Sequence, residues 1–228
     1  MNKACLVSAV LGMFLFLNLE AGADLVIFPT GPAAWMINVT PSQASAGATT
    51  ASSAQNHIVE IDVTQDNEKR RSLITWSDGK TTERWAIPRM NLILAEDSNG
   101  QAFSLLSGAL GAQILAVPFT PSSFSWISPE YLLEKDPVNY QGKPCFHYRS
   151  NQHDVQPNGK NGRTVTEEAW IDSGTLLPVA LDDGTNLGIF TFKKDPPPPL
   201  TMQAKFQDAF RRAEEAMGIV KPVYLPAN

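Results

Sequence analysis

The sequence predicts an α+β fold: a curved antiparallel sheet that forms an incomplete barrel, with a C-terminal helix packed on it. Short apolar or alternating runs recur between residues 58 and 95 and again between 144 and 192, and polar turns separate them. An amphipathic stretch follows at 201–217. The runs amount to about nine strands, and an open sheet of that width must curl because neighbouring strands twist relative to one another.

The first residues, 1–23, are expected to be a secretory signal peptide. Lys3 supplies a positive charge, residues 6–19 are almost entirely apolar, and Ala21-Gly22-Ala23 matches a cleavage site. A helix that spans a bilayer needs about 20 apolar residues, so this run is not expected to be an anchor. Residues 24–228 are then expected to form a single half-barrel domain, exported to the bacterial periplasm or outside the cell.

The first half of this domain has the pattern of an antiparallel meander. Its strongest hairpin signal is Asp78-Gly79. Strands are expected at 35–40, 59–64, 73–76, 81–87 and 90–95. Residues 41–55 are rich in Ser, Ala, Thr and Gly and have no apolar period, which predicts a flexible loop.

The middle of the chain is less regular. Residues 109–117 fit a short helix or two broken strands, and their periodicity does not decide between these. Ser128-Pro129-Glu130 predicts the start of a short helix, with Ser as N-cap and Pro at the first helical position. Asp136-Pro137 would end that helix, because a residue that precedes proline disfavours helical backbone.

The second half supplies further strands and the predicted helix. Strands are expected at 144–149, 164–172, 176–181 and 187–192. Four prolines at 196–199 predict an extended linker to a helix at 201–217, with Thr201 as its cap. The apolar residues of this helix recur at helical spacing, so we expect them to pack on the sheet. Its polar face is not rich in Lys, which disfavours the alternative of a helix lying on a membrane surface.

Composition excludes some partners. The chain has 18 Lys and Arg against 23 Asp and Glu, a formal net charge of −5, and its basic residues form no run longer than two. A nucleic-acid partner would need a concentrated basic surface, so none is expected. The most apolar stretch after residue 23 is 105–119, and it contains Gly and Pro. No transmembrane segment is therefore expected after signal cleavage.

One string resembles a catalytic motif. Asp172-Ser173-Gly174-Thr175 follows apolar residues, as the catalytic Asp of aspartic proteases does. That chemistry needs two carboxylates that share a proton, and the sequence has no second copy. Asp, Ser and Gly are common turn residues, so a hairpin turn is the preferred interpretation. A hydrolase that uses Asp172 is kept as a minor alternative, and the chain is not expected to be an enzyme.

No metal or cofactor is expected. The chain has 3 His, and none pairs with another metal ligand at a helical spacing. Cys145 is the one cysteine after the signal peptide, and we expect it to be buried as a small apolar side chain rather than reactive.

The remaining candidates for a binding site are aromatic. Tryptophans lie in or beside the predicted strands, where core packing is the simplest role for any one of them. Together they would line one face of a curled sheet and suit an apolar ligand. The candidate ligand-binding residues are Trp76, Trp85, Trp170, Phe190 and Phe206.

The stretch from 140 to 210 resembles the superfamily of outer-membrane lipoprotein carriers and lipoprotein-sorting proteins. The matching residues are Ala169-Trp170-Ile171-Asp172, Thr175, Leu177-Pro178, Gly188 and Phe190-Thr191-Phe192. The resemblance implies an unclosed barrel whose concave apolar face, covered by helices, holds acyl chains. The chain differs from that superfamily at 41–55, where a loop replaces the usual early helix.

The sequence leaves two main hypotheses. The first is an exported envelope protein that binds a lipid or another apolar ligand in the half-barrel, in lipoprotein or lipid trafficking. The alternative is a structural or interaction module of the envelope, with a protein partner and no ligand.

Overall fold

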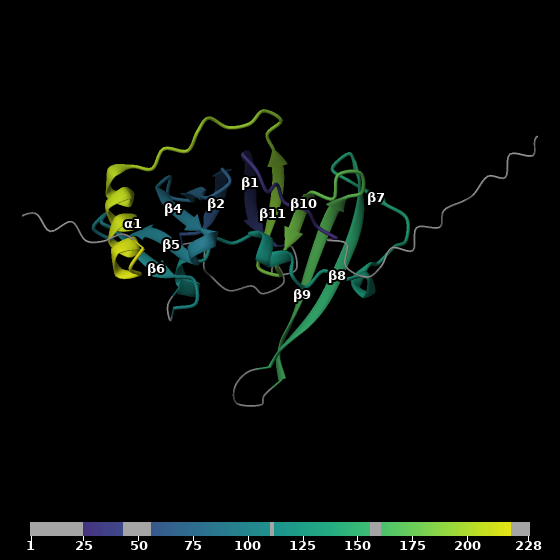
Figure 1. Ribbon diagram of the computed structural model, residues 1–228. Coiled ribbons are helices and arrows are strands. Elements are labelled where there is room, and N and C mark those ends of the chain that lie inside the picture. The colour runs from purple at the N-terminus through teal and green to yellow at the C-terminus, as the bar shows by residue number, and fades with distance from the viewer. Residues whose placement is uncertain (1–24, 43–55, 110–111, 156–160, 220–228) are drawn as a thin grey trace, which may run out of the picture.

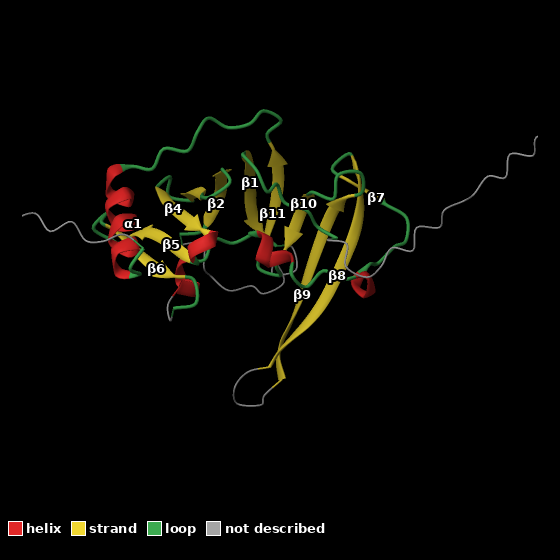
Figure 2. Ribbon diagram, in the orientation of Figure 1, coloured by secondary structure: helices red, strands yellow, loops and turns green. Residues whose placement is uncertain are grey.

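The computed structural model describes residues 25–42, 56–109, 112–155 and 161–219. The expected signal peptide at 1–23, and residues 43–55 of the expected loop, lie outside these ranges. One antiparallel sheet of eleven strands makes up most of the fold (Figures 1 and 2). The sheet is not closed into a barrel, which confirms the predicted fold class of a curved open sheet with a C-terminal helix.

The strands run β1 (Ala33–Pro41), β2 (Ile58–Gln65), β3 (Arg70–Trp76), β4 (Thr81–Ile87), β5 (Leu92–Glu96), β6 (Ala102–Leu106), β7 (Val138–Tyr140), β8 (Lys143–Val155), β9 (Asn161–Asp172), β10 (Pro178–Asp182) and β11 (Asn186–Phe192). Their order across the sheet is β6-β5-β4-β3-β2-β1-β11-β10-β9-β8-β7. Two meanders, β1–β6 and β7–β11, therefore join where β1 pairs with β11. The sequence did not predict β6 or β7, the two edge strands.

The middle of the chain differs from expectation. Of residues 109–117, the structure describes 109 and 112–117, and these contain a 3-10 turn, Ala112–Leu115. The helix expected from residue 128 is a single 3-10 turn, Pro129–Tyr131. Ser128 makes no capping hydrogen bond there. The chain instead becomes extended at Leu132, and the backbone N–H of Leu133 donates to the carbonyl of His147 at 2.9 Å. Pairing with the sheet thus overrides the local helix signal.

The two faces of the sheet bury separate apolar clusters. We name the faces after Trp35 and Trp85, which the strand registers place on opposite sides. The Trp35 face carries the larger cluster, with residues such as Ile37, Ile61 and Ile171. Residues 107–109 and 112–137, named the crossing segment here, add Phe119 and Phe124 to that cluster. Two further 3-10 turns are Pro88–Met90 and, in the crossing segment, Pro121–Phe124.

Helix α1 (Ala204–Ala216) packs on the Trp85 face of β5 and β6 (Figure 1). Phe206 is fully buried there, with its ring 6.4 Å from that of Trp85. The helix begins at Ala204 and its N-cap is Gln203, so the cap expected at Thr201 is wrong. The proline linker reaches the helix by passing over the same face, beside Ala34, Thr64 and Arg71.

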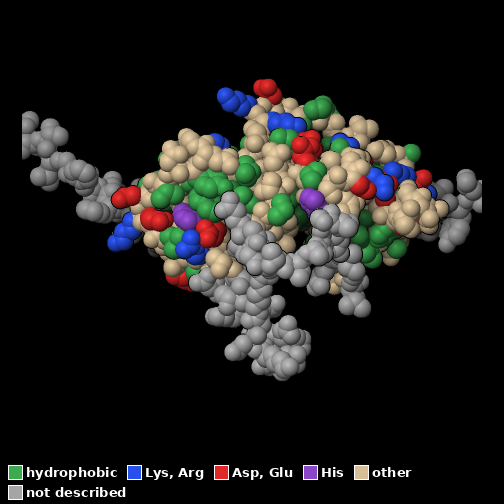
Figure 3. Space-filling model, turned by 180° about the vertical axis from the view of Figure 1, so that it is seen from behind, with side chains coloured by type: hydrophobic (Ala, Val, Ile, Leu, Met, Phe, Trp, Pro, Cys, Tyr) green, Lys and Arg blue, Asp and Glu red, His purple; other side chains and the backbone are tan. Residues whose placement is uncertain are grey.

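A buried carboxylate joins the helix to the sheet. Glu83 is 6% exposed and accepts hydrogen bonds from Trp85 Nε1 at 2.8 Å, Gln203 Nε2 at 2.8 Å and Arg71 Nε at 3.0 Å. A buried charge is tolerated when it is paired and hydrogen-bonded in this way. On the side of the molecule seen in Figure 3, acidic and basic side chains lie together in small mixed groups.

Replacing Glu83 with Leu is expected to destabilise the protein by roughly 1–3 kcal/mol, because the buried Trp85 indole N–H loses its acceptor. Urea denaturation followed by circular dichroism measures this change. Glu60→Leu removes the same charge from the Trp85 face of β2, where Glu60 is half-buried. Equal stabilities of the two variants would contradict a structural role for the Glu83 network.

Candidate functional site

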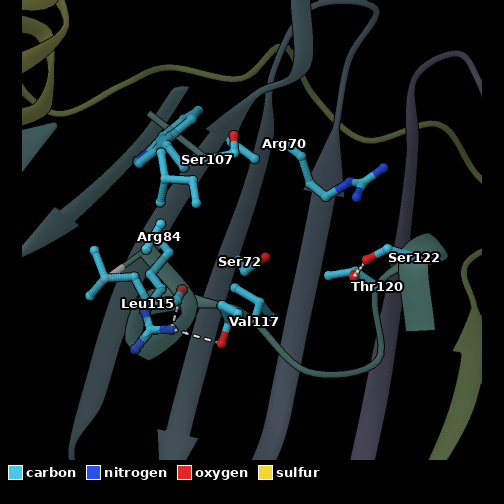
Figure 4. A pocket seen from close by; sticks show the side chains of 13 residues that line it. Arg70, Ser72, Arg84, Ser107, Leu115, Val117, Thr120 and Ser122 are labelled. Carbon is cyan, nitrogen blue, oxygen red and sulfur yellow. Dashed lines mark hydrogen bonds between the residues drawn. The ribbon is translucent and has the colours of Figure 1, made fainter. Parts of the chain in front are cut away.

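A cavity of about 310 Å³ lies between the Trp35 face of β3–β5 and the crossing segment (Figure 4). Side chains alternate between the two faces along each strand. Ala86 in β4 and Ile93 in β5 are paired, so they share a face, and both line the cavity. The crossing segment supplies Leu115 and Val117 from the other side. The pocket is therefore mainly apolar, with polar groups at a few points on its wall.

Arg84 ties the sheet to the crossing segment. Its Nη1 donates to the carbonyl of Leu115 and, at 3.1 Å, to that of Ala116, as the dashed lines in Figure 4 show. Burial lowers the pKa of the Arg84 guanidinium. Charge-assisted hydrogen bonds to two carbonyls offset part of that desolvation and hold this segment over the pocket.

Arg70 lines the pocket on the side opposite Leu115, the side on which Thr120 and Ser122 also lie, and its side chain extends away from Leu115 (Figure 4). Its guanidinium stands 5.7 Å from the centroid of the Trp35 ring, and its Nε donates to Gln65 Oε1 at 3.2 Å. Burial lowers the pKa of this guanidinium as well. Within the described part of the chain, neither pocket arginine forms an ion pair.

Phe119 closes the Trp35 face beside the pocket. The residue is 2% exposed, adopts a positive φ of 59°, and packs its ring edge-on to that of Phe190 at 6.5 Å. The ring lies directly over Gly188 in β11, where an added Cβ would come within 2.8 Å of it. The strand glycine is therefore needed for close approach of this side chain.

The five aromatic residues singled out from the sequence do not form one surface. Trp76 and Phe190 belong to the cluster on the Trp35 face. Trp85 and Phe206 pack together on the opposite face, beneath helix α1. Trp170 is also on the Trp85 face, where its ring stacks between those of Tyr140 at 4.4 Å and His147 at 4.7 Å. Their proposed contact with a ligand stays a prediction.

Asp172 holds its own turn. One carboxylate oxygen, Oδ1, accepts from the backbone N–H of Thr175 at 2.9 Å and of Gly174 at 3.0 Å. Desolvation raises the pKa of Asp172, but these hydrogen bonds outweigh it, and the net pKa lies below the ordinary value. The geometry is that of the hairpin turn preferred from the sequence.

Cys145 is fully buried in β8, as expected. Desolvation, and then the charge of Asp172, raises the pKa of its thiol. No group of three or more potential metal-ligating side chains occurs within the described ranges.

The sequence analysis missed the pocket residues Arg70, Arg84, Ile93 and Leu115. A signal was present for the arginines. Both occupy positions that alternate in phase with apolar or small inward residues of their strands, such as Ile74 and Ala86. A charged residue at an inward position marks a site that faces a cavity or a polar ligand.

Comparison with protein-family models finds no match, and comparison with curated proteins finds none either. Among solved structures, the Mycobacterium tuberculosis lipoprotein LppX matches with a TM-score of 0.40 and 12% identity. The match covers 76% of this chain and 90% of that one. A likeness of this size assigns no family and carries no argument about function.

Gly188→Ala is expected to destabilise the protein by about 1–3 kcal/mol, because the new methyl group overlaps the buried Phe119 ring. Chemical denaturation gives the size of the effect. The control is Gly108→Ala, where an added Cβ meets no atom within 4 Å and a change below about 1 kcal/mol is expected. A fully stable Gly188→Ala protein would show that Phe119 does not lie on β11.

The Cys145 thiol is expected to react slowly with Ellman's reagent at pH 8 in the folded protein. A raised pKa leaves less thiolate, and burial blocks access to the sulfur. The measurement uses a Cys5→Ser background and compares native protein with protein in urea, where the thiol should react at the rate of a free cysteine. Fast native labelling would contradict the buried position.

Proposed function

We propose that this chain is an exported binding protein that holds an apolar ligand, such as an acyl chain, in the pocket beneath the crossing segment. The observation that carries the proposal is the cavity of about 310 Å³ between β3–β5 and that segment. Small-molecule sites are concave, mostly apolar and marked by a few placed polar groups, which is the composition of this one.

The cavity volume limits the ligand. A cavity of about 310 Å³ is at the small end of the range of small-molecule sites. A site of that size suits one acyl chain of medium length. Burial of each methylene contributes about 0.8 kcal/mol, which supports useful affinity from the chain alone.

The proposed setting is the cell envelope, in lipid or lipoprotein trafficking. Support for export comes from the signal-like residues 1–23. Within the described ranges, no helix has the length and apolar character needed to cross a membrane. A binding role without a reaction is also proposed, because the Asp172 carboxylate is engaged by its own turn.

One observation favours the alternative, a ligand-free module of the envelope. Much of the Trp35 face is filled by the protein itself, since Phe28, Phe119 and Phe124 pack on Phe190. An acyl chain has room beside this cluster over β3–β5, but not over β11 without displacing these rings. The two hypotheses differ in whether the remaining cavity is ever occupied.

Native mass spectrometry of the protein purified from membranes, together with uptake of a fluorescent fatty acid, tests the proposal. Co-purified lipid and saturable uptake are expected. Absence of both would leave the ligand-free module as the better account of the fold.

Filling the pocket should weaken uptake. Ala86→Phe places a ring in the cavity and removes space for two or three methylene groups, which corresponds to roughly a tenfold or larger loss of affinity. Thr191→Phe adds the same ring at an exposed site on the Trp85 face of β11 and should bind normally. Equal affinities of the two variants would place the ligand elsewhere.

A further inference from the structure

The pocket wall has a polar side. Arg70, Thr120 and Ser122 lie on one side of the cavity, and Leu115 lies on the other (Figure 4). Ser122 is exposed, so a ligand group placed at this side would remain in reach of water. An amphiphile could therefore keep its polar group hydrated at this side while its apolar part contacts Ala86 and Ile93, and the Arg84 guanidinium near Leu115 is already engaged by the Leu115 and Ala116 carbonyls.

The Arg70 charge at this side has no acidic partner in the described part of the protein. Other arginines of the strands and the helix do pair with acids: Arg71 with Glu83, Arg149 with Glu168 and Arg211 with Glu215. Arg70 is half-buried and, within the described ranges, has only the Trp35 ring and the Gln65 side-chain oxygen as partners. A partly desolvated cation without a counter-charge is unfavourable, and an anionic ligand would relieve that cost.

The geometry of Arg70 suits a carboxylate. A guanidinium carries five N–H donors in a planar fork, and Arg70 uses its Nε towards Gln65. Its two terminal nitrogens make no hydrogen bond to the described part of the protein. They offer the paired donors that a carboxylate accepts side by side. Arg84 is committed to the carbonyls of Leu115 and Ala116, which leaves Arg70 as the anchor.

Resting on the proposed function, we infer that the ligand is a single-chain anionic amphiphile, a fatty-acid carboxylate, whose head binds the Arg70 guanidinium. One guanidinium matches one negative charge, and a cavity of about 310 Å³, at the small end of ligand sites, suits one chain of medium length. Ala86, Ile93, Leu115 and Val117 would contact the chain.

The test compares three ligands of equal chain length below their micelle concentrations: decanoate, decanol and decyltrimethylammonium. Titration calorimetry at pH 8 measures the dissociation constants for the full-length protein. Decanoate is expected to bind at least about tenfold more tightly than decanol, because a charge-assisted hydrogen bond adds to the same chain contacts. The cationic amphiphile should bind more weakly than decanol.

Arg70→Met keeps an unbranched apolar side chain and removes the charge. It should abolish the preference for decanoate while decanol binding stays within about twofold. The matched control, Arg89→Met, removes an equal charge from an exposed residue outside the pocket and should retain the preference. Arg70→Lys keeps the positive charge but loses the paired N–H donors of the guanidinium, so it should retain part of the preference for decanoate over decanol. Thermal melting checks that each variant folds.

The outcomes separate the two proposals. Binding of decanoate and decanol with equal affinity by the wild-type protein would overturn the carboxylate assignment and leave the apolar pocket intact. A preference that survives in Arg70→Met would also overturn it. No binding of any of the three ligands would reject the proposed function itself. If Arg70→Met does not fold, the discrimination among ligands by the wild-type protein still decides.

Discussion

The order of strands imposes the constraint on which the fold depends. Strands β6 and β7 follow one another in sequence but form the two opposite edges of the sheet. The chain between them must therefore travel from one edge to the other, and it does so across the Trp35 face. A connection with such a path cannot be short, and it covers a surface that an open sheet would otherwise expose to water.

The crossing segment is fixed at two points that differ in chemistry. Over the centre of the sheet, Phe119 and Phe124 enter the apolar cluster, and Gly188 leaves the space that the Phe119 ring needs. Over β4, Arg84 holds the backbone carbonyls of Leu115 and Ala116. Apolar packing fills the sheet surface at the first point, whereas a polar tie at the second leaves a cavity beside it. The pocket therefore lies where the crossing segment is held by the Arg84 hydrogen bonds instead of by aromatic side chains packed on the sheet.

The opposite face is completed by the C-terminal part of the chain. Strand β11 ends in the middle of the sheet, while the apolar surface that needs cover lies on β4–β6. The proline linker spans that distance, and α1 then packs on β5 and β6 at one edge of the sheet. The Glu83 network then fixes the helix start. Each face is thus covered by a segment that crosses it, and the crossing on the Trp35 face leaves the cavity that Arg70 and Arg84 line.

The sequence by itself determined the antiparallel class, most strand positions and the helix with its buried stripe, because alternation and helical spacing are local signals. It also identified the Asp172 turn and the buried Cys145. Only the tertiary structure decided that β6 and β7 are edges, that residue 128 starts no long helix, and that the five aromatic candidates lie on two faces. Strand order and facing depend on long-range pairing, so Arg70, distant in sequence from Leu115 and Thr120, became part of a pocket only when the crossing segment was placed.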